Sequence, residues 1–162
     1  MADFSAEGNI RVDYVATIAN IASPDVSSEL NTTTPLSGWL TPDGWAPAFT
    51  QNSVETTSLL STFITSVPGT SGGPITLTLK RDNTPANDTA WNLFKTGPSG
   101  YLVAREGQGG GSGAWTAGDK VQVYPGKAHI GLPAQSAQNA VRTFTVQWEP
   151  SAQPNLDATA QA

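Results

Sequence analysis

The chain contains no cysteine, a single histidine, few charged residues and no long run of apolar residues. Without cysteine, a disulfide scaffold is excluded. Because no window approaches about 18 apolar residues, we expect no membrane-spanning helix. No Lys/Arg cluster is present to neutralise phosphates, so tight binding to nucleic acid is not expected either. The first nine residues have no basic patch and no apolar run, which predicts synthesis in a cytoplasm without a signal peptide.

What the chain does have is a two-residue alternation of apolar and polar side chains. The alternation is found in the segments 10–14, 75–81, 121–123 and 144–148. Alternation at this period gives a strand one apolar and one polar face. The 162 residues, 38% of them hydrophobic, suit one domain with a thin core. We therefore expect a mainly β fold, a sandwich or barrel of two packed sheets, as a single domain over residues 1–149 with residues 1–9 as an N-terminal arm.

Helix signals are concentrated in one segment. Residues 85–96 follow Thr84, a candidate N-cap, and carry an apolar stripe that includes Trp91. This pattern predicts one α-helix that flanks the sheet and packs Trp91 against it. A shorter helix is expected to begin at Ser23, which has proline and aspartate after it, and to end near Asn31.

Glycine and proline mark the connections. Pro42-Asp43-Gly44 predicts a turn, and residues 68–74 predict the flexible tip of a long hairpin. The glycine-rich stretch 107–113 lacks the Lys-Ser/Thr pair of a phosphate-binding loop, so it indicates a mobile connector between strands. Residues 150–162 are small, polar and interrupted by proline, which favours a flexible C-terminal tail.

Residues that could carry chemistry are scattered. His129 has no carboxylate motif beside it, so we expect neither a metal site nor a catalytic base there, and no cofactor. Two functions are alternatives to the interpretation given in the next paragraphs. The stronger of the two is a monomeric β-sandwich carbohydrate-binding module, in which exposed tryptophans stack on sugars. Its candidates are Trp39, Trp45 and Trp115, but we favour the interpretation that these tryptophans fill the core or a subunit interface. The weaker, a distant third, is a hydrolase on a β scaffold.

The order of the segments along the chain carries a further signal. The segments concerned are 2–14, 23–24, 40–44, 77–82, 90–94, 100–103, 119–125 and 142–146. Taken together, they resemble the major tail tube proteins of long-tailed, siphovirus-type phages, especially phages of actinobacteria. The resemblance covers nearly the whole chain, from Ala2 to about Val146.

The resemblance implies a structural protein of the virion and not an enzyme. It implies six copies in a ring, rings stacked on a tape-measure protein into a hollow tail tube, and contacts with tail-tip and tail-terminator proteins. DNA would pass through the tube during ejection without specific binding, because an acidic bore repels phosphate. The subunit would be made in the host bacterial cytoplasm and would not contact a membrane.

Two sets of residues are candidates for these roles. Asp13, Glu55 and Asp82 are candidates for an acidic bore lining. The N-terminal arm, the C-terminal tail and a glycine- and proline-rich loop are candidates for contacts between rings. The loop candidates are Ser66, Val67, Pro68, Gly69, Thr70, Ser71, Gly72 and Gly73.

Overall fold

The computed structural model describes residues 8–107, 109–135 and 137–162, and it is mainly β with one short α-helix, as the sequence predicts. The larger sheet consists of β1 (Ile10–Val15), β2 (Thr34–Pro35), β3 (Leu40–Ala46), β6 (Ile75–Lys80), β7 (Ser99–Glu106), β8 (Lys120–Ala128), β9 (Leu132–Pro133), β10 (Thr143–Pro150) and β11 (Asn155–Thr159). Its main path runs β2-β1-β7-β8-β10-β6-β3, with β11 paired to β8 and β9 to β10. The smaller sheet is a hairpin of β4 (Thr50–Glu55) and β5 (Ser66–Gly72).

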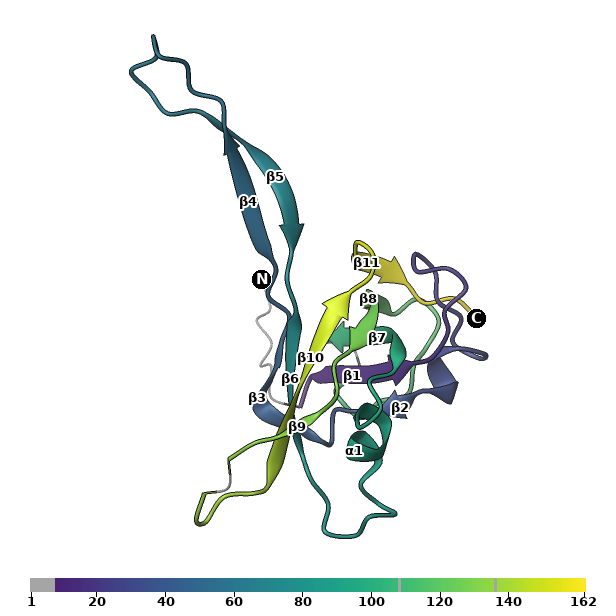
Figure 1. Ribbon diagram of the computed structural model, residues 1–162. Helices are drawn as coiled ribbons and strands as arrows, with labels where there is room; N and C mark the ends of the chain where they lie inside the picture. Colours follow the sequence, from purple (N-terminus) through teal and green to yellow (C-terminus); the bar gives the residue numbers. More distant parts are fainter. Residues whose placement is uncertain (1–7, 108, 136) are drawn as a thin grey trace.

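The larger sheet curves around the main core. Tyr14 of β1 and Trp148 of β10 have ring centroids 6.3 Å apart, although β7 and β8 separate these strands in the sheet. Trp45 of β3 and Tyr124 of β8 meet in the same edge-to-face way at 5.6 Å. The layers that enclose this core are therefore parts of one curved sheet (Figure 1).

The strands differ in how many of their faces are covered. On β1, β7 and β8 both faces are buried, because a second core packs Val103 and Val123 against Leu30, Trp115 and Ala158. On β6 and β10, one face lies in the main core while the other is polar and mostly accessible. Its cross-strand pairs are Thr143 with Lys80, Thr145 with Thr78, and Gln147 with Thr76.

The flanking helix is present but shorter than predicted. α1 spans Thr89–Phe94, and its N-cap is Asp88, whose side chain makes no capping hydrogen bond. That carboxylate instead accepts a hydrogen bond from Nε of Arg81 at 2.6 Å. Trp91 packs edge-to-face on Phe144 with 5.2 Å between ring centroids, so the helix lies against the sheet as expected.

We expect truncation of this contact to be costly. Trp91→Ala should lower the free energy of unfolding by about 3 kcal/mol, because a large aromatic side chain leaves a half-buried site. Urea unfolding of the variant and of wild type measures the difference, and Trp91→Phe, which keeps a ring on Phe144, should lose less. A loss below about 1 kcal/mol for the alanine variant would contradict the assigned packing.

The second predicted helix, from Ser23 to Asn31, is wrong. The segment forms turns, followed by a short 3₁₀ helix at Leu30–Thr32. The Glu29 N–H still donates to the Asp25 carbonyl at 3.1 Å, but side chains hold much of the segment. The Asp25 carboxylate accepts the Ser28 N–H at 2.7 Å, and Glu29 accepts the N–H groups of Ala19 and Asp25. Hydrogen bonds from the Ser28 N–H and from the hydroxyls of Ser27 and Ser28 lower the pKa of Asp25.

Two further expectations fail for a common reason, namely pairing with a distant strand. Pro42-Asp43-Gly44 does not reverse the chain but forms a bulge within β3, where the register with β6 shifts. A Cβ at Gly44 would overlap the carbonyl oxygen of Thr78, so the bulge needs glycine. Residues 150–162 are not a free tail, because β11 pairs with β8 and the side chains of Ala158 and Ala160 are buried.

Candidate assembly surfaces

The most conspicuous feature of the molecule is the β4–β5 hairpin, which protrudes from the body as a continuation of β3 and β6 (Figure 1). Every residue of its two strands is exposed. The hairpin is confirmed, but its tip is not where the sequence placed it. Residues 66–72 form β5, and the tip consists of residues 56–65, at whose base the Thr56 N–H donates to the Thr65 carbonyl at 2.8 Å.

The hairpin tip carries an apolar surface that nothing in the described chain covers. Leu59 is 106% exposed, Leu60 96%, Phe63 75% and Ile64 73%. Side chains of this size are usually buried, and a cluster of them on a protruding element indicates a contact surface for another molecule. The hairpin tip (residues 56–65) is therefore our first candidate assembly surface.

A second exposed apolar surface lies on the segment 130–142, which includes β9 and its connection to β10. Ile130, Leu132 and Val141 are each between 62% and 66% exposed. The connection from β9 to β10 lies at the end of the molecule opposite to the hairpin (Figure 1). We call the described residues of this segment, 130–135 and 137–142, the basal surface.

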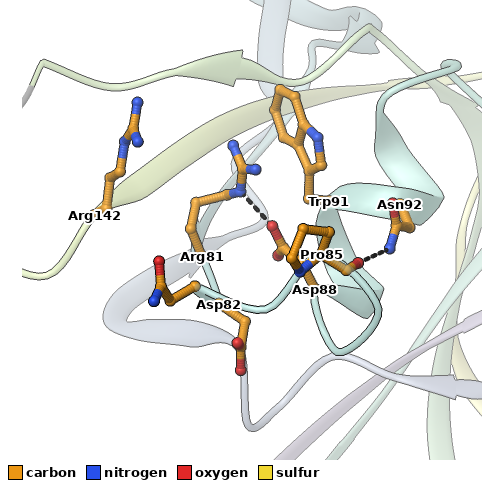
Figure 2. A pocket seen from close by; sticks show the side chains of 8 residues that line it. Arg81, Asp82, Pro85, Asp88, Trp91, Asn92 and Arg142 are labelled. Carbon is orange, nitrogen blue, oxygen red and sulfur yellow. Dashed lines mark hydrogen bonds and ion pairs between the residues drawn. The ribbon is translucent and has the colours of Figure 1, made fainter.

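A cleft of about 380 Å³ adjoins the basal surface (Figure 2). Arg81 stacks over the Trp91 ring at 3.9 Å and pairs with Asp88, while Arg142 lines the same cleft from the neighbouring segment. One oxygen of Asp88, Oδ1, is buried without a hydrogen-bond partner in the described chain. The Arg142 guanidinium likewise makes no ion pair or hydrogen bond with the described residues. The cleft thus has an unpaired cation, Arg142, and in its wall a buried acceptor without a partner, Asp88 Oδ1.

A buried charge cluster lies at the connection between β7 and β8. Arg105 is 1% exposed, donates to Asp119 at 2.6 Å, and donates to the carbonyl oxygens of Gly110, Gly113 and Ala114. The glycine-rich connection of β7 to β8 is therefore fixed by a buried guanidinium, and the expectation of a mobile connector is wrong for its described residues. Gln108, within this stretch, lies outside them.

This cluster predicts acid sensitivity. Burial raises the pKa of Asp119, but hydrogen bonds from Thr116 and Arg105 and the charge of Arg105 outweigh it, so the pKa is lowered. A lowered pKa means that the carboxylate stabilises the fold above its ordinary pKa of about 3.9 and loses this effect as the pH falls further. Urea unfolding at pH 7, 4 and 3 should show a loss of stability below pH 4 that is smaller in Asp119→Asn. Equal losses in both proteins would contradict the assignment.

The structure separates the three candidates for the bore lining. Asp13 is fully buried and accepts hydrogen bonds from Arg11, Thr33 and Trp115, so its assignment to an open bore is wrong. Glu55 is exposed on the hairpin at the end of β4. Asp82 is half-buried in the loop after β6, where it accepts the Thr84 N–H. The structure does not bring these three carboxylates together.

The structure also shows where the tryptophan candidates and His129 lie. Trp115 is 2% exposed, and Trp39 and Trp45 pack half-buried against the main core, so they do not form an open platform for sugars. His129 is exposed and forms a surface pair with Glu149 at 3.4 Å. Within residues 8–107, 109–135 and 137–162 there is no group of three or more potential metal ligands, and no helix there is long and apolar enough to cross a membrane.

The described part of the chain is a curved β domain from which the β4–β5 hairpin protrudes (Figure 1). A family model described as phage tail tube protein matches residues 1–162. The chain therefore belongs to the phage tail tube protein family, whose members are structural subunits and not enzymes. The family membership predicted from the sequence is confirmed.

Solved structures agree with this membership at the level of the fold. A chain from the tail of an empty GTA (gene transfer agent) particle, determined by helical refinement with C6 symmetry, is similar with a TM-score of 0.54. The two chains are 13% identical, and the match covers 97% of this chain and 100% of the other. At this identity the likeness shows the fold alone. No curated protein matches the chain.

Proposed function

We propose that this protein forms six-membered rings that stack into a hollow tail tube, and that DNA passes through the tube during ejection. The observation that carries the proposal is the hairpin with its uncovered apolar tip, which is unfavourable for a free monomer in water. The C6 symmetry of the tail to which this fold is similar supports the number of six.

The unpaired edges of the larger sheet support closure of the subunits into a ring. The main path ends at β3 on one side and at the two-residue strand β2 on the other. Unpaired backbone groups on edge strands favour pairing with another chain, and a heterologous contact that closes makes a ring. We propose that β3 and the hairpin strands that continue from it are paired by neighbouring subunits.

The bore is proposed to be lined by the uncovered polar face of β6 and β10. Among the residues paired on this face, the threonines and Gln147 are neutral, and Lys80 at the end of β6 is the one cation that they leave for phosphate. Asp82, in the loop after β6, and Glu55, at the end of β4 on the hairpin, stay candidates for acidic groups of the bore, and the net charge of −5 opposes adhesion of DNA. The tube is proposed to contain a tape-measure protein and to join tail-tip and tail-terminator proteins in the virion, with the subunit synthesised in the host bacterial cytoplasm.

Microscopy of the purified protein tests this proposal. At high protein concentration, negative-stain images should show annuli or tubes with an open centre, and class averages of end views should have six-fold symmetry. Sedimentation velocity should show growth with concentration. A monomer at every concentration, or a closed particle without a bore, would overturn the proposal.

A further inference from the structure

We infer that the basal surface and its cleft receive the hairpin tip of a second copy of this chain. The inference rests on the proposed stacking of rings and names the two surfaces that meet. Both surfaces are uncovered in the described chain and lie at opposite ends of the molecule (Figure 1). A contact between opposite ends of successive copies repeats without limit along one direction, which is the geometry that a stack of rings requires.

The two surfaces match in apolar character. The tip contributes Leu59, Leu60, Phe63 and Ile64, and the basal surface contributes Ile130, Leu132 and Val141. Burying such side chains against one another removes both sets from water.

The two surfaces also match in charge. Residues 50–72, the whole hairpin, contain one charged residue, Glu55, and residues 130–142 contain one, Arg142. Neither side chain forms an ion pair within the described chain. Opposite charges on two otherwise uncharged segments fix both the partner and the register of the contact.

The cleft supplies a hydrogen-bond acceptor for the arriving hairpin. Asp88 is 2% exposed at its side chain, and its Oδ1 faces no donor among the described residues. A buried acceptor without a partner is costly, and a small opening of the cleft wall by the arriving hairpin lets a hydroxyl donor satisfy it. The tip is rich in hydroxyl groups, with Thr56, Thr57, Ser58, Ser61 and Thr62. Glu55 is thereby assigned to the contact between rings, and Asp82 is left as the proposed carboxylate of the bore.

A charge-exchange experiment tests the pairing. Glu55→Arg and Arg142→Glu should each raise the protein concentration needed for tube growth by about tenfold or more, since each places like charges together. The double variant, with both changes, should restore growth. Asp157→Arg, a charge reversal at an exposed position on neither surface, should grow like wild type. A double variant as defective as the single variants would overturn the inference.

Cross-linking gives an independent test that does not depend on tube growth. Because the chain has no cysteine, Leu60→Cys and Leu132→Cys introduce unique thiols. A short bismaleimide should join the two variants when they are mixed but should give little product with either variant alone. Tubes from wild type without this mixed product would refute the named surfaces while leaving the proposed function intact. Absence of tubes and of rings from wild type would refute the proposed function itself.

Discussion

Replacing Leu59, Leu60, Phe63 and Ile64 by serine should abolish tube growth while leaving the subunit folded and equally stable. All four side chains are at least 73% exposed in the subunit, so their removal takes nothing from its core. In the assembly each contributes about 1.5 kcal/mol or more by burial, which for four amounts to roughly 6 kcal/mol and a ten-thousandfold change in the association constant.

The measurement combines thermal unfolding followed by circular dichroism with negative-stain microscopy over a range of concentrations. Leu156→Ser is the control, because Leu156 is an equally apolar and 58% exposed residue on β11 that faces the base of the hairpin, near Gln51 and Gly72, and not its tip. The control should form tubes. Normal tubes from the variant with all four serine substitutions would show that the hairpin tip has no part in assembly.

Arg105→Met should lower the free energy of unfolding by about 3–5 kcal/mol, the usual cost of removing one partner of a buried ion pair. Methionine fills much of the volume but leaves Asp119 without its counter-ion. It also leaves the carbonyl oxygens of Gly110, Gly113 and Ala114 without a donor. Trp115, whose ring lies 5.0 Å from the guanidinium carbon, loses a cation–π contact as well.

Urea unfolding of this variant is compared with Lys120→Met, which breaks the exposed pair between Lys120 and Asp157. The exposed pair should contribute less than about 1 kcal/mol, because water screens it and its side chains are flexible. Similar losses for both variants would mean that the Arg105 cluster is no more important than a surface ion pair.

Local patterns predicted local features well. The alternation of apolar and polar side chains predicted β1, β6, β8 and β10, because the two-residue period of a strand involves only neighbouring residues. The apolar stripe around Trp91 predicted α1, although the helix starts only at Thr89, after Asp88, whose carboxylate pairs with Arg81 and does not cap the helix. The failures share a different cause. The turn at Pro42 and the tail after Pro150 have ordinary loop composition, and only pairing with β6 and β8 makes them strands.

Among the candidate site residues, Asp13 shows most clearly that the sequence does not predict whether a side chain is buried. An aspartate in an alternating strand looks the same whether its side chain faces water or a buried tryptophan. Arg11, two residues earlier on the same face, was the only nearby signal of an internal pair. The sequence predicted the wrong hairpin tip, because the glycines and proline of residues 66–73 are typical of a turn. The turn instead forms between Thr56 and Thr65.

The sequence by itself determined a mainly β fold, the flanking helix and the family, because strand period, helix stripe and the order of segments are local or linear properties of the chain. The tertiary structure alone decided which surfaces are left uncovered. Exposure depends on contacts between residues far apart in the chain, and these contacts bury Asp13 and the C-terminal segment while leaving the hairpin tip and the basal surface open at opposite ends.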